Sequence, residues 1–233
     1  MFRKIAILLL ITVCSAAAPY RAAAESTQTA LPDTMWVATA RAAFVNLPPD
    51  ALHLLSRQMR EDMLAYLDND TIRPIYNALE GQSSLTRPVT DTYLKCQISP
   101  VSSMTIRILP AEKSPLIATV YTIDSPGQPA DSQISFYDSQ MKPVKTSKHL
   151  KLARIQDFIV NADHEKKKQI MDAVPFPTVE YVLGPDGDTL TATLTAQDLL
   201  GEEQLQEIRK YLNPTITYIW NGRKFVPNDK HKK

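Results

Sequence analysis

Cys96 carries a thiol, which is a group that could act as a nucleophile. A catalytic thiol needs a neighbouring base and a lowered pKa, because the thiolate is the attacking species. Cys96 alternates with Leu94 and Ile98 in an apolar pattern that is typical of one face of a strand. Such a position predicts a small buried side chain. We therefore expect Cys96 to pack in the core and not to attack a substrate.

Histidines and acids could hold a metal ion, but their spacing does not favour a site. No two histidines stand at a metal-ligand spacing such as His-x-x-x-His. The segment Asp163-His164-Glu165 could supply zinc ligands, yet it fits the solvated start of a helix better. We expect neither a metal nor another cofactor. The four histidines are His53, His149, His164 and His231.

Asp186-Gly187-Asp188 could contact calcium through its carboxylate oxygens. A calcium loop needs several more oxygen ligands at fixed steps, and these are missing. The same residues follow Gly184 and Pro185 between two alternating apolar segments, which is typical of a hairpin turn. The turn is the better interpretation.

A hydrolase site could be assembled from residues that lie far apart in the sequence. Ser83 offers a hydroxyl close to Gly81, although the Gly-x-Ser-x-Gly pattern of a nucleophile elbow is missing. Asp62 and His53 could serve as its partners. Asp62 stands beside Glu61 on an expected helix, where surface charge is the simpler interpretation. A hydrolase would bring these groups together in a deep polar cleft.

Aromatic side chains suggest a binding surface near the end of the chain. Trp220, Tyr218 and Phe225 gather in one expected hairpin, and Trp36 lies near the start of the folded part. If exposed, such a cluster would suit a partner protein or a glycan. Core packing is the alternative and the more common role. We keep Trp220, Tyr218 and Phe225 as speculative partner-binding residues.

The elements that would position these residues begin with a helix over residues 49–68. Pro49 and Asp50 suit a first helical turn. Apolar residues then recur at three- and four-residue steps, which places them on one helical face. These residues are Leu52, Leu55, Met59, Met63, Tyr66 and Leu67.

Strands follow the first helix. Alternating patterns predict strands over 94–98, 104–108 and 134–136, and the more evenly apolar segment 116–123 predicts a central strand. Residues 124–132 connect the last two as a loop.

The second half of the chain reads as helix, hairpin, helix and hairpin. Asp163 is an expected N-cap for a helix to Ala173. A hairpin over 179–194 follows, after which Thr195 and Asp198 are spaced as a capping box for the next helix. The helical stripe of that helix is Leu205, Ile208 and Leu212. A strand over 216–220 then leads to Asn221-Gly222, a strong hairpin-turn signal, and to a return strand over 223–226.

The two halves of the chain contain similar segments. Residues 134–144 and 216–226 align without a gap and share three identical positions, so an internal duplication is possible. We predict an α+β fold of two lobes, each with a small antiparallel sheet and a packed helix. The expected boundaries are 33–146 for the first lobe, 147–154 for a linker, 155–227 for the second lobe and 228–233 for a basic tail.

The first 24 residues are typical of a cleavable secretory signal. A basic start precedes an apolar stretch over 5–13, and small residues lead up to an expected cleavage after Ala24. Residues 25–32 then predict a disordered lead-in. Lipidation at Cys14 is an alternative that would anchor the protein to a membrane. We expect a periplasmic or cell-surface location.

The net charge argues against one class of partner, and the cysteine count indicates how the fold is stabilised. Cleavage removes three bases and no acid, which leaves 23 bases against 25 acids and a net charge of −2. A nearly neutral body has no strong field to attract nucleic acid, and we expect no nucleic-acid partner. Cys96 is then the single cysteine and cannot form an internal disulfide. Burial of apolar surface must therefore stabilise the fold.

Several motifs stand in a particular order along the chain: residues 60–67, residues 79–83, residues 94–109 with Ser102-Ser103, Asp131-Ser132 ahead of Phe136-Tyr137, and residues 218–226. In this order they resemble an exported family of the Bacteroidetes, domain of unknown function 3256. Glu61 departs from the Leu-like residue expected there. The resemblance covers most of the chain after the leader. It implies a periplasmic or surface location and no established activity.

The leading functional hypothesis is a non-catalytic binding or assembly protein of the cell envelope, with an envelope protein or a glycan as its partner. One alternative is the envelope hydrolase built from Asp62, Ser83 and His53. Another is a protease-inhibitor-like protein that presents the loop 124–132. A binding module should show an exposed apolar patch or an open sheet edge.

Overall fold

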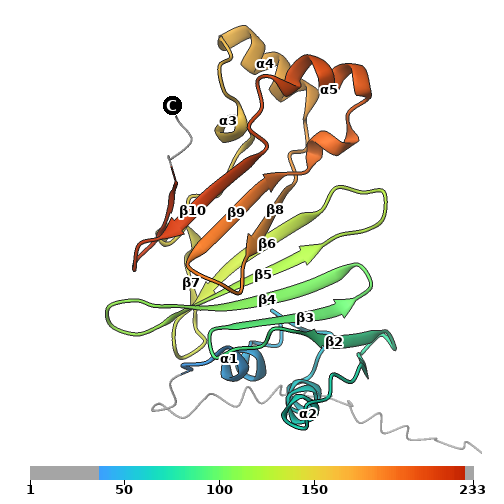
Figure 1. The fold of residues 1–233 in the computed structure, drawn as a ribbon, viewed down its shortest axis with the longest axis vertical. Helices are drawn as coiled ribbons and strands as arrows, with labels where there is room; N and C mark the ends of the chain where they lie inside the picture. Colours follow the sequence, from blue (N-terminus) through green and yellow to red (C-terminus); the bar gives the residue numbers. More distant parts are fainter. Residues whose placement is uncertain (1–36, 229–233) are drawn as a thin grey trace, which may run out of the picture. The chain divides into compact units, whose positions relative to one another are not determined.

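Two antiparallel sheets with helices packed against them make up the computed structural model, which describes residues 37–228 (Figure 1). These residues belong to one compact unit that begins at Asp33. The architecture confirms the predicted α+β class. The leader, the lead-in, Cys14, Trp36, His231 and most of the basic tail lie outside the described residues.

The larger sheet has seven strands that pair in chain order. Apolar alternation predicted its central strands, and the burial of Leu94, Cys96 and Ile98 confirms that pattern. The loop between β5 and β6 covers residues 124–130 and is two residues shorter than expected, because Asp131 and Ser132 pair with Ile123 and Thr122. The strands are β1 (Ile75–Tyr76), β2 (Gln82–Thr86), β3 (Tyr93–Ser99), β4 (Ser102–Leu109), β5 (Leu116–Ile123), β6 (Asp131–Tyr137) and β7 (Pro143–Val144).

The smaller sheet has four strands in the order β11-β10-β9-β8. Both predicted hairpins are confirmed, and Gly187 and Gly222 take the positive φ angles of 79° and 89° that their turns require. The strands are β8 (Val179–Leu183), β9 (Thr189–Leu194), β10 (Thr215–Trp220) and β11 (Phe225–Pro227).

The predicted helix over 49–68 was too long at its start. The helix α2 (Arg57–Asp68) begins after Ser56, whose hydroxyl accepts from the N–H of Met59. This N-cap overrides Pro49, and residues 48–55 form turns instead. The short helix α1 (Ala40–Asn46), capped by Thr39, was not predicted. Seven residues are too few for a clear helical period.

Arg60 joins these two helices. Its guanidinium is buried, and it donates to the carbonyl oxygens of Phe44 at 2.8 Å and Leu47 at 2.9 Å. These carbonyls end α1, where partial negative charge accumulates. Burial lowers the pKa of Arg60 to about 10, with the neighbouring Arg57 as a smaller cause.

Two longer helices lie beside the end of the smaller sheet, together with the one-turn helix α3 (Ile155–Phe158) (Figure 1). The predicted start of α4 (His164–Ala173) is confirmed, because Asp163 accepts from the N–H of Lys166 at 2.8 Å. The predicted capping role of Thr195 was wrong. Its hydroxyl donates to the carbonyl oxygen of Ala130 instead, and α5 (Glu202–Arg209) begins after Gly201. A 3₁₀ turn, η2 (Ala196–Leu199), fills the space between.

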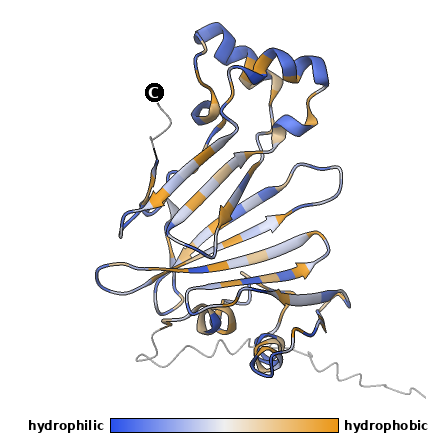
Figure 2. Ribbon diagram, in the orientation of Figure 1, coloured by the Kyte–Doolittle hydropathy of each residue, from blue (hydrophilic) through white to orange (hydrophobic). Residues whose placement is uncertain are grey.

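Both faces of the larger sheet are buried around β4. One face packs against α1, whose contacts include β3 and β4. On the other face β8 crosses β4, β5 and β6, and this contact buries Thr105 and Arg107 although the alternation of β4 marks them as polar. In Figure 2, hydrophobic positions recur along the strands, whereas α4 and α5 are mainly hydrophilic.

The segment 147–154, predicted as a linker, is mostly exposed, but two of its side chains contact the core. After the 3₁₀ turn η1 (Thr146–Lys148), Leu150 is buried, and the ring of His149 lies 5.3 Å from that of Phe136 and 6.1 Å from that of Trp220. One apolar core includes side chains from β4, β5 and β6 and from all four strands of the smaller sheet. The internal duplication stays a prediction.

Candidate functional site

Cys96 is fully buried on β3. Burial raises the pKa of its thiol to about 12, so the thiolate is scarce at neutral pH. Its Sγ lies 3.6 Å from the carbonyl oxygen of Gln97. The surroundings therefore suit a packed side chain and oppose nucleophilic chemistry.

The three hydrolase candidates take separate roles. The hydroxyl of Ser83 donates to the carbonyl oxygen of Ile98 at 2.6 Å and accepts from Asn77 at 3.1 Å. Asp62 accepts from Gln58 at 2.9 Å on the exposed side of α2, and His53 is exposed in the turns before that helix. The proton of Ser83 is thus committed to a main-chain acceptor. None of the hydrogen bonds among residues 37–228 joins the three side chains.

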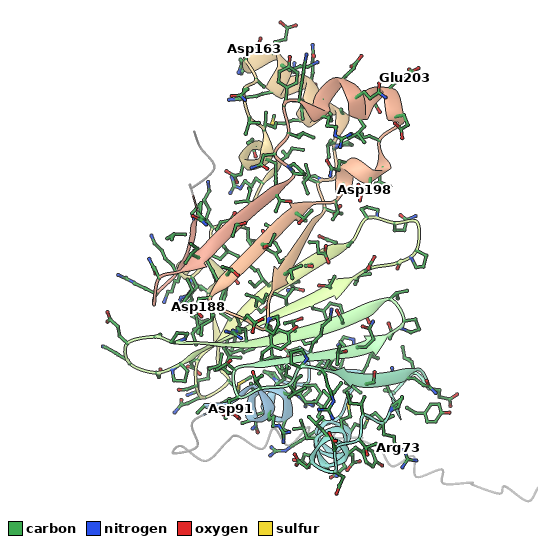
Figure 3. All side chains as sticks on the ribbon, viewed as in Figure 1. Arg73, Asp91, Asp163, Asp188, Asp198 and Glu203 are labelled. Carbon is green, nitrogen blue, oxygen red and sulfur yellow. The ribbon has the colours of Figure 1, made fainter. Side chains whose placement is uncertain are left out.

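Charged groups do not converge into a metal site within the described part of the chain. Among residues 37–228, no group of three or more His, Cys, Asp or Glu side chains could hold a metal ion. Figure 3 shows Asp163, Asp198 and Glu203 at the helical end of the molecule, far from Asp91 and Arg73. The turn that includes Asp186 uses the carbonyl oxygens of Pro185 and Gly187 to accept from Arg107, as a structural turn does.

The aromatic residues proposed for partner binding do not form an exposed patch. Trp220, Tyr218 and Phe225 are only 5%, 4% and 4% exposed, because the larger sheet and residues 149–158 cover them. The indole of Trp220 donates to the carbonyl oxygen of Pro110 at 2.6 Å. Its ring lies 5.2 Å from that of Phe225 in an edge-on arrangement. The expected exposed cluster is therefore corrected to a core cluster.

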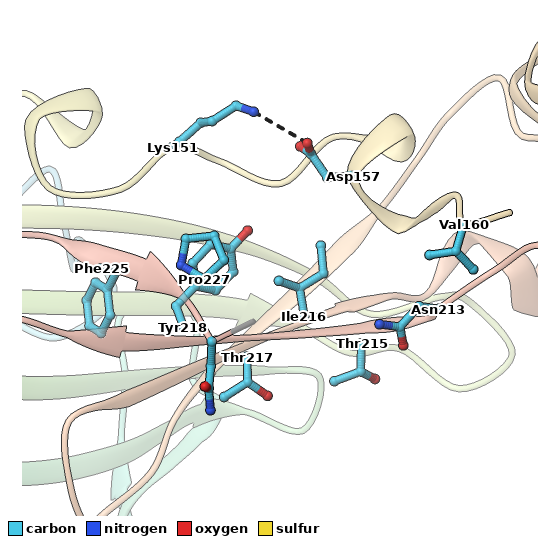
Figure 4. A pocket seen from close by; sticks show the side chains of 11 residues that line it. Lys151, Asp157, Val160, Asn213, Thr215, Ile216, Thr217, Tyr218, Phe225 and Pro227 are labelled. Carbon is cyan, nitrogen blue, oxygen red and sulfur yellow. Dashed lines mark hydrogen bonds and ion pairs between the residues drawn. The ribbon is translucent and has the colours of Figure 1, made fainter. Parts of the chain in front are cut away.

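A groove nevertheless opens beside two of these rings. It has a volume of about 570 Å³ and lies between strand β10 and the segment 151–160 (Figure 4). Its apolar lining is Val160, Ile216, Tyr218, Phe225 and Pro227, and its polar lining is Lys151, Asp157, Asn213, Thr215, Thr217 and Asn228. An apolar floor with a few polar groups at the rim is typical of ligand pockets.

The groove exposes part of the main-chain edge of β10. Strand β11 pairs only with Tyr218–Trp220, and the N–H of Asn228 reaches the carbonyl oxygen of Thr217. On the β9 side, the N–H of Leu194 donates to Pro214 and the N–H of Trp220 donates to Asp188. Main-chain groups alternate in direction along a strand, so those of Thr215 point into the groove. Within the described chain, no strand lies beside Thr215 on that side.

An ion pair marks the rim. Lys151 Nζ lies 3.4 Å from Asp157 Oδ1, and Figure 4 shows the two side chains reaching across the space above Ile216 and Pro227. The other oxygen of Asp157 accepts from the N–H of Arg154 at 2.9 Å. Below the pair, burial raises the pKa of Tyr218 to about 12, with Tyr181 and Asp157 as smaller causes. Tyr218 therefore stays neutral.

A second, smaller hollow lies between the β8 edge of the smaller sheet and the larger sheet. Its volume is about 140 Å³, and its lining is mostly polar, with Lys95, Gln97 and Thr105 from the larger sheet facing Glu180 and Val182 of β8. It lacks the apolar floor of the β10 groove. The β10 groove is therefore the better candidate for a functional site.

The comparisons with known proteins agree with this architecture. A family described as "Protein of unknown function (DUF3256)" matches residues 34–225. The chain belongs to the DUF3256 family. A solved domain of an uncharacterized protein from Porphyromonas gingivalis W83 is similar to this DUF3256 chain, with 25% identity and a TM-score of 0.70. The match covers 81% of this chain and 96% of that domain.

A comparison with curated proteins finds no match. Among residues 37–228, no helix has both the length and the apolar character that a membrane span needs. The groove is the candidate functional site of this DUF3256 chain. Sequence reasoning missed its rim, because Lys151 stood in an expected linker and Thr215 lay between an expected helix end and the expected strand over 216–220. The missed signal was the short return strand, which pairs with only half of β10 on the edge opposite β9 within residues 37–228.

Proposed function

We propose that this DUF3256 protein is a non-catalytic binding or assembly module of the cell envelope. The observation that carries the proposal is the open main-chain edge of Thr215 above an apolar floor. An extended segment of a partner can add to such an edge through main-chain hydrogen bonds, while the floor accepts an apolar side chain. This combination binds without needing an activated nucleophile or a metal.

An envelope protein fits the groove better than a glycan. Glycan sites usually offer exposed aromatic rings, and here the rings of Tyr218 and Phe225 form the floor while Trp220 is buried behind them. A main-chain edge instead recognises another polypeptide. The envelope location rests on the leader over residues 1–24, and lipidation at Cys14 would add a membrane anchor.

The test is a comparison of two substitutions at one position. Thr215→Pro removes the N–H that points into the groove, and proline is tolerated where a strand's N–H faces outward. Thr215→Val keeps that N–H and nearly the same shape. The mature protein and both variants are immobilised and exposed to envelope extract of the source organism. We expect a polypeptide that the parent and Thr215→Val retain and Thr215→Pro loses.

Thermal unfolding of both variants gives the necessary control for folding. If every captured polypeptide binds the three proteins equally while all three are folded, the groove is not the binding site and the proposal fails.

A further inference from the structure

We infer that the groove binds the carboxyl-terminal end of an extended peptide whose last side chain is apolar. This inference rests on the proposed function and specifies its ligand. Three features carry it: the short gap in the edge of β10, the apolar floor, and the exposed cation Lys151 at the rim.

The gap sets the length of the ligand. Before it, the edge is occupied by the residues that pair with 211–213: the N–H of Val160 donates to Tyr211, and the N–H of Asn213 donates to Phe158. After the gap, the N–H of Asn228 donates to the carbonyl oxygen of Thr217. Residues 213 and 217 are about 13 Å apart at the usual rise of a strand, and both are occupied, so within the described chain only the edge opposite residues 214–216 is free. A segment of about two or three residues fits there, so a chain end is favoured over the middle of a long strand.

The floor selects an apolar side chain near that end. Ile216, Tyr218 and Phe225 share the buried face of the smaller sheet, and Val160 and Pro227 complete the floor on either side. Alternate residues of an added strand point to opposite sides. One side chain of a short segment would therefore lie on the floor while its neighbours point to solvent.

The charges at the rim favour a carboxylate over an ammonium group. Each oxygen of Asp157 already accepts one hydrogen, from Lys151 or from the N–H of Arg154. Lys151 is 78% exposed, so its ammonium group has further N–H donors that can reach an anion while it stays paired with Asp157. Arg154 is exposed three residues along the chain from Lys151, and it adds positive charge to the same segment.

The probe is a fluorescein-labelled hexapeptide with valine at a free carboxyl terminus, compared with the same peptide ending in a carboxamide. Binding to the mature full chain is measured by fluorescence anisotropy. We expect the free carboxylate to bind roughly fivefold tighter than the amide, which corresponds to one exposed charge pair. Lys151→Ala should abolish this difference, and Thr215→Pro should weaken both peptides.

Lys168→Ala is the matched control, because Lys168 is an exposed lysine on α4 that does not line the groove. It should leave both affinities unchanged. Equal binding of the two peptides, or an unchanged difference in Lys151→Ala, would overturn the inference.

Two other occupants give distinct results. If octanoate competes with the peptide and binds equally well to Thr215→Pro, the groove recognises an amphiphile and not a main chain. If a variant truncated after Asn228 binds the peptide and the full chain does not, the protein's own residues 229–233 are the occupant. Either result overturns the inference. Should capture remain sensitive to Thr215→Pro while neither peptide binds, the proposed function survives and the carboxyl-terminal ligand alone is rejected.

Discussion

Arg107 of β4 donates from Nη1 to the carbonyl oxygen of Pro185 at 2.6 Å and from Nη2 to that of Gly187 at 2.9 Å. The two hydrogen bonds join residues 78 and 80 positions apart and attach the β8–β9 turn to the larger sheet. Arg107 is 7% exposed, and its Nε has no partner among the described residues. This arginine therefore holds the two sheets together in their crossed arrangement.

Arg107→Met should lower the free energy of unfolding by about 2–3 kcal/mol, because two hydrogen bonds from a charged group are lost. Arg107→Lys should recover part of this loss, since an ammonium group cannot reproduce the planar fork of the guanidinium. Urea denaturation measures both. The control is Arg57→Met, which removes an exposed pair with Glu61 at 2.9 Å and should cost less than about 0.5 kcal/mol. Equal losses for the two arginines would contradict the proposed role.

Cys96→Ala should lower stability by about 1–2 kcal/mol at pH 7, the usual loss for a small buried side chain. The difference should shrink at high pH. The ordinary pKa of the thiol is 9.0 and its folded pKa is about 12, so above pH 9 the unfolded chain binds fewer protons than the folded one. The free energy of unfolding of the parent therefore falls as pH rises from 9 toward 12, by roughly 1 kcal/mol at pH 10.

Denaturation curves of both proteins at pH 7 and pH 10 measure this effect. A thiol reagent at pH 8 gives an independent check, because it should label the folded parent slowly. Rapid labelling, or a stability difference that grows with pH, would show that the thiol is accessible.

Trp220→Phe should lower the free energy of unfolding by about 1–2 kcal/mol, because the carbonyl oxygen of Pro110 loses its donor and the core loses volume. Phe176→Ala is the contrasting change, since Phe176 is 81% exposed and should tolerate substitution within about 0.5 kcal/mol. Differential scanning calorimetry compares the two. A larger loss for Phe176 would mean that the aromatic core is misplaced.

If residues 1–24 act as the expected cleavable leader, the mature protein should begin at Glu25. N-terminal sequencing of the protein recovered from the envelope measures this directly. A protein that begins at Cys14 and carries the added mass of a lipid would instead establish the anchored form. Cys14→Ser separates the two cases, because it should leave the location unchanged only when no lipid is attached.

Local chemistry along the sequence predicted most of the elements. The N-cap at Asp163, the turn at Gly187 and the hairpin at Gly222 depend on residues a few positions apart, and the structure confirms all three. The buried alternation around Cys96 was visible for the same reason. Helix starts were less certain, since Ser56 and Pro49 offered competing signals and the sequence alone did not show which would begin the helix.

The sequence by itself therefore determined the α+β class, the strand faces and the family resemblance. Only the tertiary structure decided that Arg107 is buried, that Trp220 is in the core and that Thr215 faces an open groove. Each of these outcomes depends on which distant segment lies against the residue. Periodicity shows which side chains share a face, but it does not show what covers that face or where a neighbouring strand stops.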